Sequence, residues 1–182
     1  PAVMAEMIYQ TYFSFKVIFP VTVFVMIGAV TMLFRTPLPV FLSVAVSLLS
    51  ALWTVGISAF VSPKLSLLYG MVPSVVTIVA VSDVIHLWSA YLHELALGQD
   101  RDEAILSSAT DVGRACLLTS VTTSVGFLSI ALIPTPMFQE LGIVLGAGVG
   151  IALLLAMTLV PIAASRGKRP SEVAQRMENP IG

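Results

Sequence analysis

The segment VAVSDVIHLW, residues 79–88, carries one aspartate and one histidine in an otherwise apolar stretch. Asp83 and His86 are three residues apart, so on a helix they share a face. If hydrocarbon surrounds them, the neutral form of the carboxyl is favoured, and Asp83 could bind and release protons while His86 tunes the exchange. The alternative is a protonated aspartate that joins two helices by a hydrogen bond. We favour proton exchange, because ionisable residues inside membrane helices by default indicate a functional site.

A threonine stripe is the second feature with possible chemistry. Thr119, Thr122 and Thr123 recur at helical spacing after the charged segment that ends at Arg114. Hydroxyl groups in lipid need hydrogen-bond acceptors, so this stripe could support the Asp83 carboxyl. The alternative is packing, with each hydroxyl bonded back to a carbonyl of its own helix.

Three glycines in GIVLGAGVG, namely Gly142, Gly146 and Gly150, are spaced four residues apart. This small-xxx-small pattern predicts a face for close helix packing.

The chain shows no zinc-ligand spacing, phosphate-binding loop or nucleophile motif, so we expect no metal, no cofactor and no nucleic-acid partner. An intramembrane enzyme is disfavoured, because the sequence offers neither paired acids nor a metal-ligand cluster.

Composition indicates the solvent around these residues. The chain has 182 residues, of which 57% are hydrophobic and 10% charged, whereas soluble domains are about 25% charged. Five stretches lack Asp, Glu, Lys and Arg altogether: 17–34, 36–63, 65–82, 115–139 and 141–165. Each is close to or above the roughly 18–20 residues with which a helix crosses the hydrocarbon core. Their continuous apolar character excludes barrel strands, so we expect an all-α membrane protein with five transmembrane helices.

The expected transmembrane domain covers residues 17–165, with helices at about 17–34, 38–60, 65–89, 115–133 and 139–164. Residues 1–16 predict an interfacial helix, and residues 166–182 a cytoplasmic tail. Gly98 should end the extension of the third helix. Residues of about 100–113 predict a separate amphipathic helix on the cytoplasmic face, with a capping box formed by Asp100 and Glu103.

The distribution of Lys and Arg predicts how the chain is oriented in the membrane. Two of them, Lys16 and Lys64, lie on one side of a five-span chain. Seven lie on the other: Arg35, Arg101, Arg114, Arg166, Lys168, Arg169 and Arg176. The excess of Lys and Arg marks the cytoplasmic side, so we expect the N-terminus outside and the C-terminus in the cytoplasm.

Two segments carry a resemblance to a known family: VSDVIHLWSAYLHELALGQDRDEAI and VGRACLLTSVTTSVGFLSIALIPTPMFQELGIVLG. Together with the helix order, they resemble the membrane domain of the resistance-nodulation-division (RND) superfamily, especially its large-membrane-protein (MMPL-like) lipid exporters. The same five-helix unit occurs in sterol-sensing domains. The resemblance implies helices two to six of one half of a two-half transporter, preceded by an extracytoplasmic domain from which residues 1–16 would lead.

The resemblance also implies roles. Asp83 matches the position of the proton-relay acid in the fourth family helix. Many multidrug members carry two adjacent acids there, whereas the neighbours here are Ser82 and Val84, which favours the lipid-exporter branch. We therefore expect a proton-motive-force-driven exporter of lipid-like or other hydrophobic substrates in the bacterial inner membrane. Its partners would be membrane lipid and the second half of the same transporter chain, and an oligomer is left open. The alternative is a sterol- or lipid-sensing regulatory membrane domain.

Overall fold

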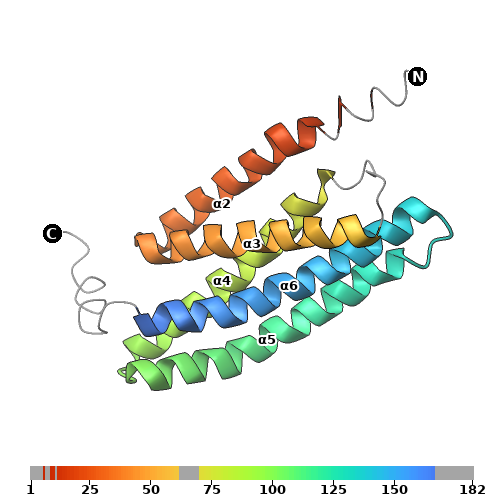
Figure 1. Ribbon diagram of the computed structural model, residues 1–182. Helices are drawn as coiled ribbons and strands as arrows, with labels where there is room; N and C mark the ends of the chain where they lie inside the picture. Colours follow the sequence, from red (N-terminus) through yellow and green to blue (C-terminus); the bar gives the residue numbers. More distant parts are fainter. Residues whose placement is uncertain (1–5, 7–8, 11, 62–69, 167–182) are drawn as a thin grey trace.

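The computed structural model describes residues 6, 9–10, 12–61 and 70–166 (Figure 1). Within these ranges the chain forms helices and turns and no strand. The elements are a π-helical turn η1 (Ser14–Ile18) and five α-helices: α2 (Phe19–Phe34), α3 (Pro37–Val61), α4 (Val72–Ala96), α5 (Arg101–Ile130) and α6 (Pro136–Arg166). With η1 and α2 counted as one, five helices are long and apolar enough to cross a membrane. The predicted all-α membrane fold is confirmed.

Local sequence explains where the helices end. Arg35 adopts a left-handed conformation with φ of 51° directly after α2, and Pro37 then opens α3, a position that suits proline because no amide hydrogen is needed there. Gly98 has φ of 87° after α4, a conformation that glycine adopts without steric cost. The prediction that Gly98 ends this helix is confirmed. The predicted start of that helix near residue 65 lies outside the described residues, as do most of residues 1–16 and all of the tail after Arg166.

The helix boundary expected near residue 114 is wrong. The structure has a single helix α5 in place of separate helices at about 100–113 and 115–133. No proline interrupts this segment, and its buried side continues without a break through Ala104, Ser108, Gly113, Cys116 and Ser120. The expected capping box is also absent, because Asp100 occupies the N-cap position without a side-chain cap bond.

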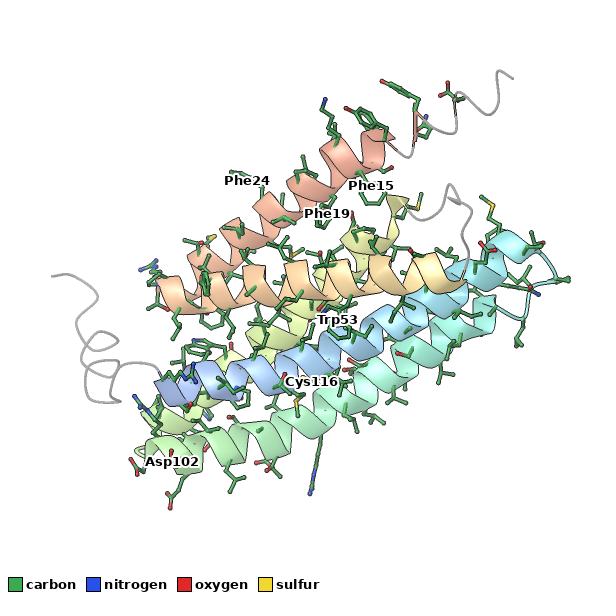
Figure 2. All side chains as sticks on the ribbon, in the orientation of Figure 1. Phe15, Phe19, Phe24, Trp53, Asp102 and Cys116 are labelled. Atoms are coloured by element: carbon green, nitrogen blue, oxygen red, sulfur yellow. The ribbon has the colours of Figure 1, made fainter. Side chains whose placement is uncertain are left out.

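Helices α4 and α6 form the centre of the bundle. Helix α6 packs against α3, α4 and α5, and α4 packs against α2, α3, α5 and α6. The core between them is built from valine and alanine, including Val76, Ala80, Val84, Val144, Ala152 and Ala156. Helix α2 lies on the outside (Figure 1) and buries Val30 alone, whereas Phe24 points away from the bundle (Figure 2). The apolar outer surface of α2 suits contact with lipid.

Candidate functional site

Asp83 lies on α4 at the contact with α5. Its side chain is only 5% exposed, and the Ser120 hydroxyl of α5 hydrogen-bonds to its carboxyl group. Cys116, one turn before Ser120, is also buried and lies close enough to interact electrostatically with Asp83; Figure 2 labels it on α5. The second carboxyl oxygen, Oδ2, has no hydrogen-bond partner among the described residues. The site is therefore a buried carboxyl that is only half satisfied.

Small residues on α5 make this contact possible. Cys116 and Ser120 are four residues apart and are both buried. Residues at this spacing occupy one side of a helix, and their short side chains let α4 approach closely. The Asp83 carboxyl therefore reaches the Ser120 hydroxyl directly. Gly113 faces α6 instead, where a methyl group on it would meet the Met157 side chain. Ser120 did not stand out in the sequence, because its hydroxyl is chemically like that of the adjacent Thr119.

His86 lies one turn beyond Asp83 on α4. Its imidazole interacts electrostatically with the Asp83 carboxyl, yet its side chain is exposed on the surface of the five-helix unit. The two sequence-predicted proton-exchange residues therefore lie together, with the aspartate inside the helix contact and the histidine at its edge.

The threonine stripe lies elsewhere. Thr119, Thr122 and Thr123 are exposed, and each hydroxyl donates to backbone carbonyls of its own helix, for example from Thr123 to Thr119 at 2.7 Å. Successive helical residues point about 100° apart, so the inward position of Ser120 turns Thr119 and Thr122 outward. Thr123, one turn after Ser120, is exposed as well. The structure does not bring the threonines to Asp83, and it shows the back-bonded arrangement given above as the alternative.

Two of the three spaced glycines lie at the contact between α5 and α6. A methyl group on Gly142 would lie 2.7 Å from the backbone oxygen of Phe127, and one on Gly146 would lie 2.9 Å from the Leu128 side chain. The Ser124 hydroxyl donates to the Gly146 carbonyl at 3.1 Å across the same contact. Gly150 has open space around it.

A glycine outside that pattern packs on the other side of α6. A methyl group on Gly148 would lie 2.8 Å from the side chains of Thr54 and Val76. Helix α6 therefore uses glycines on two faces, one toward α5 and one toward α3 and α4. The four-residue spacing predicted only the first.

The chemistry that this arrangement permits is narrow. No group of three or more His, Cys, Asp or Glu residues that could hold a metal ion occurs in the described part of the chain. A buried charge without a partner is costly, so a carboxyl with one hydroxyl donor suits a change between neutral and charged states. A static hydrogen bond between α4 and α5 also fits the geometry.

Comparison with known protein families covers the whole bundle. A family model described as the MMPL family matches residues 1–179. A protein of Methanocaldococcus jannaschii, whose name describes it only as a membrane protein, is 38% identical over 77 residues. That alignment covers 42% of this chain and 20% of the relative, so it spans only a small part of that protein. No solved structure matches the chain.

Proposed function

Because the chain belongs to the MMPL family, whose model covers residues 1–179, we propose that it is the membrane part of an exporter of lipid-like or other hydrophobic substrates. Export is driven by the proton motive force, and Asp83 is the residue that exchanges protons. The observation that carries this proposal is the half-satisfied carboxyl, buried between α4 and α5 with one oxygen unpartnered. The partners are membrane lipid and a second half of the same transporter chain.

The proton would change the contact between α4 and α5. In the neutral state the Asp83 carboxyl fits the apolar interface and keeps its bond to Ser120. When the proton leaves, a buried charge with a single hydroxyl donor remains, and such a charge drives rearrangement or hydration. His86 would tune this step, because it lies one turn from Asp83 at the exposed edge of the site. Movement of α5 would pass to α6 through their close glycine contacts.

The test replaces Asp83 with asparagine in the full-length protein. Asparagine keeps the size and hydrogen-bonding capacity of the neutral acid but does not titrate. We expect Asp83→Asn to insert at normal abundance and to lose proton-dependent export. Asp83→Glu should retain partial export, because one added C–C bond moves the carboxyl by about 1.5 Å.

Export is measured beside membrane abundance, and proton flux is measured in proteoliposomes with an imposed pH gradient. The matched control is Asp111→Asn, the same substitution at an exposed position of α5, and it should export normally. Normal proton-dependent export by Asp83→Asn would contradict the proposal and leave Asp83 as a structural hydrogen bond between helices.

A further inference from the structure

The outer surface of the five-helix unit is of two kinds. On α2 and α3 the exposed residues are mainly large and apolar, which suits contact with lipid; examples are Phe24, Met32, Phe41 and Leu52. On α4 and α5, in contrast, one exposed face carries polar and small residues. This α4–α5 polar face consists of Ser82, His86 and Ser89 of α4 and of Thr119, Thr122, Thr123 and Gly126 of α5.

The residues of this face lie on one side of the contact between α4 and α5. Asp83 and Ser120 face each other there. His86 follows Asp83 by three positions, and Thr123 follows Ser120 by three, so both side chains are turned by the same angle from the contact. Since α4 and α5 run in opposite directions (Figure 1), equal turns bring the two side chains to the same side. The polar residues of the two helices therefore form one surface beside Asp83.

Contact with lipid does not suit this surface. Histidine within a membrane helix almost always faces the interior of a bundle or a water-filled cavity, yet His86 is exposed within α4. Hydroxyl and small residues are typical of contacts between membrane helices. The other side of α5 has the character expected for lipid, because its exposed residues are apolar, among them Leu117, Val121 and Val125.

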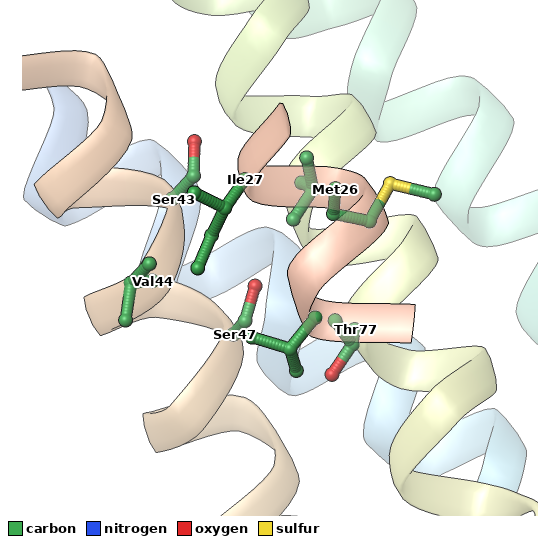
Figure 3. Close-up of a pocket in the computed structure, with 8 residues that line it drawn as sticks. Met26, Ile27, Ser43, Val44, Ser47 and Thr77 are labelled. Carbon is green, nitrogen blue, oxygen red and sulfur yellow. The ribbon is translucent and has the colours of Figure 1, made fainter. Parts of the chain in front are cut away.

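The molecule covers polar residues on another face with a helix. Ser43 and Ser47 of α3 and Thr77 of α4 are buried beneath α2 (Figure 3). Helix α5 lies on the opposite side of the bundle from α2 (Figure 1). Within the part of the chain that the structure describes, no element covers the α4–α5 polar face, whose residues are all exposed. Its cover therefore lies outside the described residues.

The length of a relative indicates what that cover is. The 77 aligned residues are 20% of the Methanocaldococcus jannaschii protein, which is therefore about 385 residues long. Two units of this chain's 182 residues would take up almost all of that length and leave no room for the extracytoplasmic domain that the family resemblance implies. The relative thus has room for one five-helix unit, and a chain with one unit obtains a second only from another copy.

We propose that the α4–α5 polar face binds the same face of a second copy of this chain, across a twofold axis along the membrane normal. A twofold contact requires a surface that complements itself. Hydroxyl and imidazole groups meet this requirement, because each can both donate and accept hydrogen bonds. Gly126 has nothing within 4 Å, which lets another helix approach closely. The second copy then takes the part of the second half of the transporter, but the interface itself does not depend on proton-driven export.

Disulfide crosslinking in native membranes tests which face is used. Single cysteines replace Ser82, Ser89, Thr119 or Thr122 in a full-length protein whose native cysteines, Cys116 included, are changed to serine. Near a twofold axis a residue meets its own copy, so we expect oxidation to give covalent dimers at one or more of these positions. Leu117→Cys and Val121→Cys, on the apolar side of α5, are the matched controls and should stay monomeric.

The same experiment distinguishes a second copy from a second half of the same chain. A single cysteine has no partner within its own chain, so a second half in that chain would give no covalent dimer. Absence of dimers at all four positions overturns the proposal, and so do equal dimer yields in the two control variants.

Native mass spectrometry of the full-length protein released from nanodiscs counts the chains. We expect two chains per particle in the wild type and a severalfold loss of the dimer in Gly126→Leu. The single unit has room for this leucine, whereas a helix packed on Gly126 does not. Gly28→Leu is the matched control, because Gly28 is exposed on α2 and also has nothing within 4 Å; it should stay dimeric.

A wild type with one chain per particle overturns the proposal, as does a Gly126→Leu variant that is as dimeric as Gly28→Leu. The proposed function fails separately. A single-chain protein whose export is lost in Asp83→Asn would remove this interface and leave proton-driven export in place.

Discussion

Arg101 donates a hydrogen bond from Nη1 to the backbone oxygen of Ser165 at 3.0 Å, and so ties the first residue of α5 to the last turn of α6. The same guanidinium hydrogen-bonds to the Tyr91 side chain of α4. A cation at the carboxyl end of a helix also interacts favourably with the carbonyls exposed there. Three long helices therefore meet at one side chain.

We expect Arg101→Gln to lower the stability of the full-length protein by about 1 kcal/mol. Hydrogen bonds to charged groups contribute about 1.5–3 kcal/mol, and the partial exposure of this one reduces the effect. Thermal unfolding in detergent measures the change. Arg114→Gln, on the exposed side of the same helix, is the matched control and should have little effect; equal losses in both variants would contradict the role given to Arg101.

The glycine contact predicts a difference between neighbours on α6. Gly142→Ala should lower stability by about 1–3 kcal/mol, because its methyl group would lie 2.7 Å from the backbone nitrogen of Ala131 and from the backbone oxygen of Phe127. Gly150→Ala should be neutral or slightly stabilising, since nothing lies within 4 Å and alanine favours helix. Thermal unfolding of the two variants side by side decides this, and an equal effect would show that the helices are not in close contact at Gly142.

Ser120, and not the threonine stripe, should control the environment of Asp83. Infrared spectra of the full-length protein report the carbonyl stretch of a protonated aspartic acid, which Asp83→Asn identifies by its loss. Ser120→Ala removes the hydrogen bond to the carboxyl, so we expect this band to move to higher frequency. The triple change of Thr119, Thr122 and Thr123 to Val should leave the band in place. A shift in the triple variant without one in Ser120→Ala would reverse this assignment.

The orientation of the chain can be tested at two exposed positions. Thr135 lies in the turn between α5 and α6, and Asp102 lies at the start of α5 (Figure 2). If the excess of basic residues marks the cytoplasmic side, Thr135→Cys should react with an impermeant maleimide in intact cells. Asp102→Cys should react only after permeabilisation. Native Cys116 is 4% exposed and should stay unlabelled in both, so it need not be removed; the opposite labelling pattern would invert the topology.

Helix positions were predictable because lipid imposes a simple rule on the sequence. Charge-free runs of about twenty residues must be helices, and prolines and glycines then determine their ends. The expected helix at about 38–60 is observed as Pro37–Val61. The expected helix at about 139–164 begins earlier, at Pro136, because proline is readily accommodated in the first turn.

The partner of Asp83 was not predictable in the same way. Ser120 and Thr119 are adjacent and chemically alike, and only the packing of α5 decides which of them faces α4. The sequence did not predict that α5 is one continuous helix, for a related reason. Charge patterns distinguish water from lipid along the chain, but a helix can pass from one solvent to the other without a break.

An unbroken α5 can act as a lever. Its 30 residues extend about 45 Å, whereas the hydrocarbon core is about 30 Å thick. If the Ser124–Gly146 bond is the fulcrum, Ser120 lies about 6 Å from it and Arg101 about 35 Å. A tilt of about 10° then moves Ser120 by about 1 Å and Arg101 by about 6 Å, which would break the hydrogen bond between Arg101 and Ser165. A movement of about 1 Å at Ser120, enough to break one hydrogen bond at Asp83, would therefore become about six times larger at the far end of the helix.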